Sequence, residues 1–159
     1  PIRVFIQSNN GKHSIDKSVI EFINRERMFG LDKLACYKEF GEKVNRIGGE
    51  AKDFVQKAKN EGKKIIGYGS PAKATTLLNF LNIDKNHIDL IVEDNPLKHG
   101  KILPGVRIPI KSRESLKDMN PDYVIILAWN FAEEILRNNE ELQRNGAKFV
   151  VLNPKLKIF

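Results

Sequence analysis

The chain of 159 residues carries a net charge of +7, with 41% hydrophobic and 30% charged residues, as expected for one globular domain with a substantial core. No apolar run approaches the roughly 20 residues of a membrane-spanning helix, so we expect no membrane partner. The 27 Lys and Arg residues are dispersed and lack interleaved aromatic side chains, which argues against nucleic acid as a partner.

Residues 1–62 predict a strand followed by two helices. The apolar run 2–7 is typical of a strand. Because the sequence opens on this run without a start methionine, we expect 1–62 to be a segment that leads from an upstream domain. Ser14 or Asp16 is the expected N-cap of the first helix, which ends near Gly30. Its inner face is expected to carry four apolar side chains: Val19, Ile20, Phe22 and Ile23.

The second helix is expected over about 31–60, where apolar residues recur at three- and four-residue spacing. Three glycines weaken the case for one unbroken helix: Gly41, Gly48 and Gly49. The amphipathic pattern indicates packing against the chain's own domain or a neighbouring one. Cys36 is the single cysteine of the chain, so an internal disulfide is impossible and a cytoplasmic location is expected.

From residue 63 onward, strands alternate with helices. This pattern predicts a Rossmann-like α/β domain over 63–159, with a mostly parallel sheet of four to five strands flanked by helices. Strands are expected at 64–67, 88–92, 123–127 and 148–152, and helices at about 71–81 and 131–145. Ligands of such sheets bind beyond the carboxyl ends of the strands, so we expect a site where the first three strands end.

The most informative segment, 65–79, reads IIGYGSPAKATTLLN. An apolar run meets a Gly-x-Gly turn at Gly67 and Gly69, and Pro71 opens a helix. A helix N-terminus presents unpaired N–H groups to an anion, and Lys73 adds a positive charge where the dipole alone favours an acid. The segment lacks the third glycine of the dinucleotide fingerprint and the P-loop spacing. A phosphate-bearing ligand and a ligand-free turn therefore both stay open.

Two further strand ends carry candidate ligand contacts. Asp94 lies about 25 residues after Gly69, near the position of the ribose-binding acid in dinucleotide folds, although a plain turn also explains it. Trp129 and Asn130 follow a buried strand and are placed to hold a flat ring, unless Trp129 belongs to the core. In the loop after Asp94, Lys98 is placed to contact a phosphate, or it is merely solvated.

Catalytic signals are weak along the whole chain. The three histidines, His13, His87 and His99, are scattered without the spacing of metal ligands, and no nucleophile elbow is present. We therefore expect neither a catalytic residue nor a metal site in this chain. Any chemistry is expected elsewhere in the enzyme.

Three blocks of the sequence, 67–79, 94–105 and 121–130, together resemble one family. They are similar to the C-terminal domain of the sugar C-methyltransferases. Those enzymes use S-adenosylmethionine to methylate a ring carbon of a nucleotide-linked keto-deoxysugar. The resemblance covers nearly the whole chain. Ser70 and Ala128 depart from the family pattern, which often has Ala and Pro there.

The resemblance implies a domain that binds a nucleotide-diphosphate sugar. The turn 69–73 would meet the diphosphate, and the other strand ends would line the crevice. The candidate substrate-binding residues are Tyr68, Gly69, Ser70, Pro71, Ala72, Lys73, Thr75, Asp94, Asn95, Lys98, His99, Trp129 and Asn130.

The resemblance also implies that S-adenosylmethionine, zinc and the catalytic base belong to the methyltransferase and zinc-binding regions of the full-length protein, so this chain alone would be inactive. The methyltransferase domain would be its partner. Two alternatives stay open: a stand-alone nucleotide-binding Rossmann module, and a structural interaction domain with a vestigial pocket.

Overall fold

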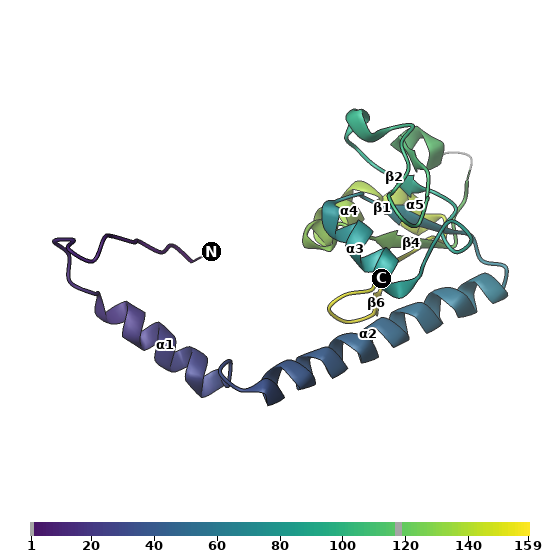
Figure 1. Cartoon of the computed structure of the whole chain (residues 1–159). Helices are drawn as coiled ribbons and strands as arrows, with labels where there is room; N and C mark the ends of the chain where they lie inside the picture. The colour runs from purple at the N-terminus through teal and green to yellow at the C-terminus, as the bar shows by residue number, and fades with distance from the viewer. Residues whose placement is uncertain (1, 117–118) are drawn as a thin grey trace. The chain divides into compact units, whose positions relative to one another are not determined.

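The computed structural model describes residues 2–116 and 119–159 (Figure 1). The chain divides into two compact units, residues 1–42 and Lys43–Phe159. The helix α2 (Leu34–Asn60) contributes to both units. The boundary that we expect at residue 62 stays a prediction. Among the helices of the described residues, none has both the length and the apolar character that crossing a membrane requires.

The first unit contains the helix α1 (Lys17–Phe29) and the beginning of α2. Asp16 is the N-cap of α1, and its Oδ1 accepts a hydrogen bond from the Ser18 N–H at 2.9 Å. Gly30 ends the helix in a left-handed conformation, with φ of +84°. The end predicted near Gly30 is confirmed, and of the two candidate caps the structure selects Asp16.

Two predictions for this unit are wrong. Residues 2–7 form no strand, because a strand needs a neighbour for its backbone hydrogen bonds and the described residues offer it none. The expected inner face of α1 is exposed to solvent. None of the residues 2–42 is buried, so this unit has no hydrophobic core of its own.

The second helix is one element of 27 residues that begins three residues later than the expected 31. Its glycines do not interrupt it. Gly48 is buried, and a Cβ atom added there would lie 3.0 Å from Cε1 of Phe80 and 3.1 Å from Cδ2 of Leu81. The small residues Gly48, Ala51 and Ala58 therefore allow the second half of α2 to pack closely on the α/β unit.

The second unit is built on a six-stranded sheet in the order β3-β2-β1-β4-β5-β6. The strands are β1 (Ile65–Tyr68), β2 (Ile91–Val92), β3 (Ile110–Lys111), β4 (Tyr123–Ile126), β5 (Lys148–Val151) and β6 (Lys157–Ile158). The first five strands are parallel, and β6 pairs antiparallel with β5. The predicted α/β fold with a mostly parallel sheet is confirmed, and the sheet has one or two strands more than expected.

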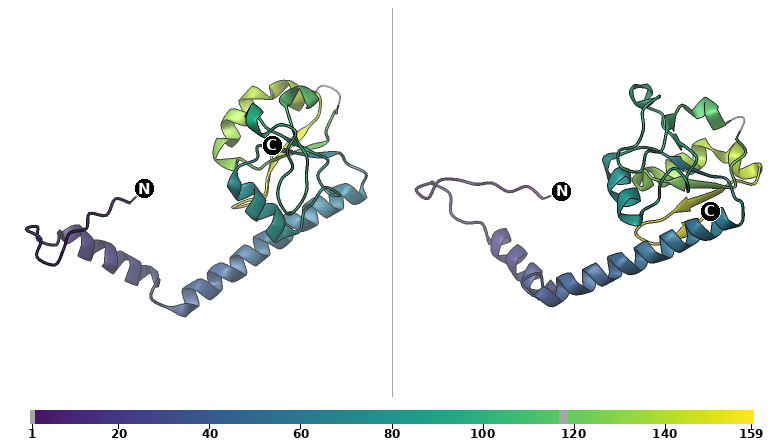
Figure 2. Two further views of the ribbon diagram at one scale, coloured as in Figure 1. Left: turned by 45° about the horizontal axis from the view of Figure 1, so that its top comes forward. Right: turned by 45° about the vertical axis from the view of Figure 1, so that its right-hand side comes forward.

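Helices connect the first five strands of this sheet (Figure 2). They are α3 (Ala72–Leu81), α4 (Ala132–Asn138), α5 (Glu140–Arg144) and the short 3-10 helices η1 (Pro96–Lys98), η2 (Arg113–Leu116) and η3 (Trp129–Phe131). The single helix expected over 131–145 is divided at Asn139. The Asn139 side chain donates a hydrogen bond to the Ile135 carbonyl at 2.6 Å, so it competes with the backbone of the helix.

Alternate strand residues enter two hydrophobic clusters. Ile65 and Ile125 pack with buried residues of α2 and α3, whereas Ile66 and Val124 pack with Ile135 of α4. Because successive side chains of a strand point to opposite faces, the central strands are covered on both faces. Their carboxyl ends are therefore the places where polar side chains reach solvent.

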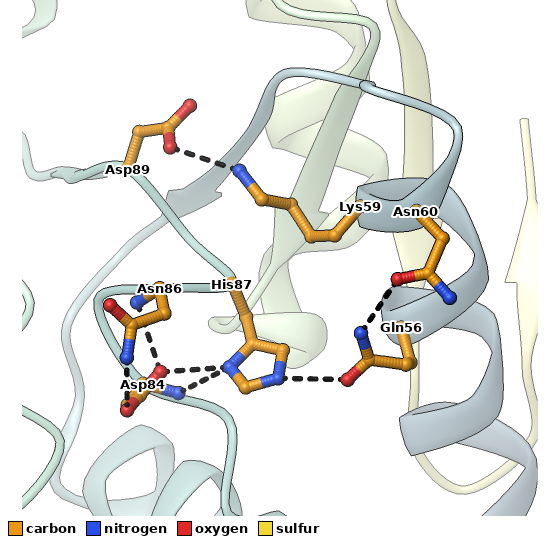
Figure 3. A network of polar contacts seen from close by, with 7 residues as sticks. All are labelled: Gln56, Lys59, Asn60, Asp84, Asn86, His87 and Asp89. Atoms are coloured by element: carbon orange, nitrogen blue, oxygen red, sulfur yellow. Dashed lines mark hydrogen bonds and ion pairs between the residues drawn. The ribbon is translucent and has the colours of Figure 1, made fainter.

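A polar network connects the end of α2 to the loop between α3 and β2 (Figure 3). The His87 ring contacts the Asp84 carboxylate through Nδ1 at 2.8 Å and the Gln56 amide oxygen through Nε2 at 3.3 Å. Lys59 pairs with Asp89 at 3.3 Å. A hydrogen bond from the Asn86 N–H, together with His87, lowers the pKa of Asp84. The network fixes the segment that leads into β2.

Candidate functional site

The candidate site lies at the carboxyl ends of three neighbouring strands. In the sheet, β1 is flanked by β2 and β4. The chain leaves β1 toward β2 and later returns on the other side of β1 as β4, so the strand order reverses between β1 and β4. Such a switch point is where open α/β sheets bind their ligands. The convergence predicted from the sequence is confirmed for these strand ends.

Gly69 brings the segment after β1 against the segment after β4. Its φ is +83°, and an added Cβ atom would lie 2.8 Å from the Cβ of Ala128. Both the left-handed backbone and the close approach require glycine here. Gly69 thereby places the start of α3 beside Trp129.

The N-terminus of α3 faces this junction without a side-chain cap. Pro71 occupies the N-cap position and makes no capping hydrogen bond. The N–H groups of Ala72 and Lys73, the first two helical residues, have no acceptor within the helix. The Lys73 ammonium lies 3.8 Å from the centroid of the half-buried Trp129 ring, in cation–π contact. One positive side chain and two backbone donors thus gather at the switch point.

Glu93 organises the neighbouring turn. Its Oε2 accepts hydrogen bonds from the Ser70 N–H at 2.9 Å, from the Ser70 hydroxyl at 2.6 Å and from Lys98 Nζ at 3.1 Å. Its Oε1 accepts one from the Asn95 N–H at 3.1 Å. Burial raises the pKa of Glu93, but the hydrogen bonds from Ser70, Asn95 and Lys98 outweigh it and lower the pKa to about 2. Glu93 is therefore a carboxylate at neutral pH.

This carboxylate changes the expected role of the turn. The N–H and hydroxyl of Ser70 already bind Glu93, so the donors left for an anion are those of Ala72 and Lys73. Lys98 neutralises Glu93 and also donates to the Ser70 carbonyl at 3.1 Å. Glu93 is absent from the sequence-based site residues. Two features of the sequence could have indicated a role for Glu93 in the site: it directly follows a buried strand, and it lies five residues before Lys98.

Other candidate residues hold the loop after β2. The Asn95 side chain accepts from the Leu97 N–H at 3.0 Å and caps η1. His99 Nε2 donates to the Glu93 carbonyl at 2.7 Å. These side-chain groups serve the conformation of the loop, which for Asn95 agrees with the plain-turn interpretation of residues 94–96. The roles of Asn95 and His99 in ligand binding stay predictions.

Tyr68 connects the ends of β1 and β2. Its hydroxyl lies 3.2 Å from both carboxylate oxygens of the exposed Asp94. Burial raises the pKa of the Tyr68 hydroxyl, and the charge of Asp94 adds to the rise. Tyr68 is therefore protonated at neutral pH and donates to Asp94. Asp94 is exposed, so solvent still reaches its carboxylate, and its role in ligand binding stays a prediction.

The remaining candidates are less connected. Thr75 is half-buried in α3, and Asn130 is exposed in η3. Over residues 2–116 and 119–159, no side-chain hydrogen bond joins either of them to the cluster around Glu93. The roles of Thr75 and Asn130 in ligand binding stay predictions.

Two hollows of the surface lie away from the Lys73–Trp129 contact. One of about 440 Å³ is bounded by η2, α4 and α5, including Arg113 and Asn139. The other, of about 350 Å³, includes His99 and Lys101. Neither is lined by Lys73 or Trp129. Within the described residues, His, Cys, Asp and Glu side chains form no group of three that could hold a metal ion.

Comparison with known proteins decides the family. Residues 1–154 match the family described as the C-methyltransferase C-terminal domain. The chain belongs to this family. The resemblance seen in the sequence blocks is thereby confirmed.

A curated relative gives the extent of the match. The chain is similar to C-methyltransferase NovU of Streptomyces niveus, with 35% identity over 157 residues. The alignment covers 99% of this chain but 37% of that protein. The chain therefore spans little more than a third of the length of this relative.

Proposed function

We propose that this domain binds the nucleoside diphosphate portion of a nucleotide-linked sugar and holds it for methylation of a sugar carbon by the rest of the polypeptide. The observation that carries the proposal is the cation–π contact between Lys73 and Trp129 at an uncapped helix N-terminus. It combines a positive charge, a flat apolar ring and backbone donors without an acceptor in the helix, at a strand-order switch point.

The diphosphate would be held by the N–H groups of Ala72 and Lys73 and by the Lys73 ammonium. A cation–π contact at a partly exposed site contributes about 0.5–1 kcal/mol, whereas a hydrogen bond to a charged group contributes about 1.5–3 kcal/mol. A diphosphate can therefore draw Lys73 away from the indole. The Trp129 ring is then available to stack with the base or to face the sugar.

S-adenosylmethionine is assigned to the rest of the polypeptide. Its sulfonium carries a positive charge, and so does the Lys73 ammonium at the start of α3. The start of α3 therefore suits an anion better than a sulfonium. When bound elsewhere, the cofactor supplies the methyl group, and this domain contributes binding energy and orientation at the nucleotide end of the substrate.

One observation favours a second function, a structural interaction domain without a ligand. Glu93 occupies the Ser70 donors of the turn and places a negative charge there. Lys98 offsets this charge, while the exposed Asp94 adds a negative charge and Lys73 a positive one. The positive charge of Lys73 at the start of α3 supports the binding proposal, and the two functions differ in nucleotide affinity.

Calorimetric titration of the chain with thymidine diphosphate, uridine diphosphate and S-adenosylmethionine tests the proposal. We expect saturable binding of a nucleoside diphosphate and about tenfold weaker binding after Lys73→Ala. Lys52→Ala, which removes an exposed lysine of α2, is the matched charge control and keeps the affinity. Tight binding of S-adenosylmethionine, or no binding of either diphosphate, would contradict the proposal.

A further inference from the structure

A hollow of about 440 Å³ lies between η2 and the junction of α4 with α5. Its volume is within the range of small-molecule sites in proteins. Two leucines line it, Leu116 and Leu142, and both pack in the hydrophobic cluster on the α4 side of the sheet. Most of the polar residues that line it are exposed. The hollow therefore has an apolar floor and a polar rim.

Asn139 borders this hollow with a buried side-chain amide. The residue is 3% exposed, and its Nδ2 donates to the Ile135 carbonyl at 2.6 Å. Burial raises the pKa of the Tyr68 hydroxyl, and a hydrogen bond from the Asn139 side chain opposes the rise. An inverted amide would place Oδ1 against the Ile135 carbonyl oxygen, and two acceptors cannot bond to each other. The orientation of the amide is therefore fixed.

The amide oxygen of Asn139 is left as an open acceptor. Within residues 2–116 and 119–159, this Oδ1 has no hydrogen-bond partner. Asn139 also occupies the N-cap position of α5 but makes no side-chain capping bond, although asparagine is a favoured N-cap residue. A buried acceptor without a donor costs about 1–3 kcal/mol. A bound molecule that supplies a donor would remove this cost.

Arg113 connects the two walls of the hollow. Its Nη2 donates to the Asn138 carbonyl, so the exposed guanidinium of η2 is held at the end of α4. This bond uses one of the several N–H groups that a guanidinium carries. Arg113 lines the same hollow as Asn139. A positioned donor group and an open acceptor therefore lie on the border of one hollow.

The residues around the hollow favour a neutral ligand with many hydroxyl groups. The described lining residues include one arginine, Arg113, and two glutamates, Glu114 and Glu141, so an anion such as phosphate is not favoured. Asn120 and Asn145 add side-chain amides, which both donate and accept, as hydroxyl groups do. None of the described lining residues is aromatic, so a nucleobase would find no ring on which to stack.

We propose that the hollow between η2 and the junction of α4 with α5 binds a neutral sugar. A sugar hydroxyl would donate to Asn139 Oδ1, and the Arg113 guanidinium would donate to a second sugar oxygen. The C–H groups of the sugar would pack on the leucine floor. Neither Lys73 nor Trp129 lines this hollow. The inference is therefore separate from the diphosphate proposal and holds whether or not the strand ends bind a nucleotide.

Titration followed by nuclear magnetic resonance tests the proposal, with D-glucose, D-galactose and L-fucose as probes and with uridine and inorganic phosphate as comparators. We expect at least one sugar to bind saturably in the millimolar range and to shift the side-chain amide signals of Asn139. Arg113→Ala should weaken this binding about tenfold. Arg137→Ala is the matched control and keeps the affinity, because Arg137 is an exposed arginine of α4 that does not line the hollow.

Asn139→Ala tests the open acceptor itself and should abolish sugar binding. Because Asn139 also holds the junction of α4 with α5, Arg113→Ala decides the test if this variant does not fold. Shifts that do not saturate with any of the three sugars, saturable binding of uridine or phosphate in place of a sugar, or equal affinities of Arg113→Ala and Arg137→Ala would overturn the proposal. So would the absence of any sugar-dependent shift, and magnetisation transfer from water to the Asn139 amide would then identify an ordered water as the donor.

Discussion

The Lys73 ammonium lies over the Trp129 ring, 3.8 Å from its centroid. This contact joins the segment that follows β1 to the segment that follows β4. Trp129 is the single tryptophan of the chain, so its fluorescence reports directly on the site. Removing the cation changes the surroundings of the indole. We expect Lys73→Ala to shift the emission spectrum of the free chain, whereas Lys52→Ala leaves it unchanged. Identical spectra for all three proteins would show that the contact does not persist in solution.

Gly69 should be intolerant of substitution. Gly69→Ala combines a φ of +83° with a Cβ contact of 2.8 Å to Ala128, so we expect a loss of about 2–4 kcal/mol in the free energy of unfolding. Gly146 has a φ of +96° but open space around it. Gly146→Ala should therefore cost only the backbone part, about 1–2 kcal/mol. Urea denaturation of both variants measures the difference, and equal losses would contradict the role of the close approach.

Two neighbouring glycines of α2, Gly48 and Gly49, should respond differently to substitution by alanine. Gly49 has no atom within 4 Å of an added Cβ, so Gly49→Ala should stabilise the chain by about 0.5–1 kcal/mol through helix propensity. At Gly48, the same change meets Phe80 and Leu81 at 3.0 and 3.1 Å, and the gain should be lost. Thermal denaturation of both variants distinguishes them. A gain at Gly48 as large as at Gly49 would mean that α2 packs more loosely than described.

Acid should weaken the fold through Glu93. Its pKa is about 2 in the folded chain against 4.5 for a free glutamate. A lowered pKa contributes stability that is present above pH 4.5 and lost as the pH falls toward 2. The contribution is at most about 3 kcal/mol. We expect Glu93→Gln to flatten the dependence of unfolding free energy on pH between about 5 and 2.

Glu61→Gln is the control for this dependence, since Glu61 is an exposed glutamate at the end of α2. Chemical denaturation at a series of pH values measures both variants. If Glu93→Gln and Glu61→Gln show the same pH profile as the parent chain, the carboxylate does not stabilise the turn.

The sequence predicts most of the sheet because its long strands are apolar runs. The elements β1, β4 and β5 lie within one residue of their expected positions. Strands β3 and β6 have two residues each, one lysine and one isoleucine. A pattern of two residues is too short to predict a strand. Residues 2–7 have the composition of a strand but no described neighbour to pair with. Strand formation depends on such a neighbour, which composition does not specify.

The site is predictable in part for a similar reason. The Gly-x-Gly turn, Lys73 and Trp129 are recognisable from local patterns, and parallel topology brings them together. The hydrogen bonds of Glu93 join residues up to 23 positions apart, and such partners become visible only in three dimensions. The same holds for Asn139, whose side chain divides the expected helix at 131–145.

The most direct test of the central proposal is Trp129 fluorescence during titration with thymidine diphosphate, with thymidine as the ligand without phosphates. We expect a saturable change with the diphosphate, a much weaker response to thymidine, and about tenfold weaker binding in Lys73→Ala. Equal responses to thymidine diphosphate and thymidine, or a response unaffected by Lys73→Ala, would contradict a site in which Lys73 and the start of α3 hold the diphosphate.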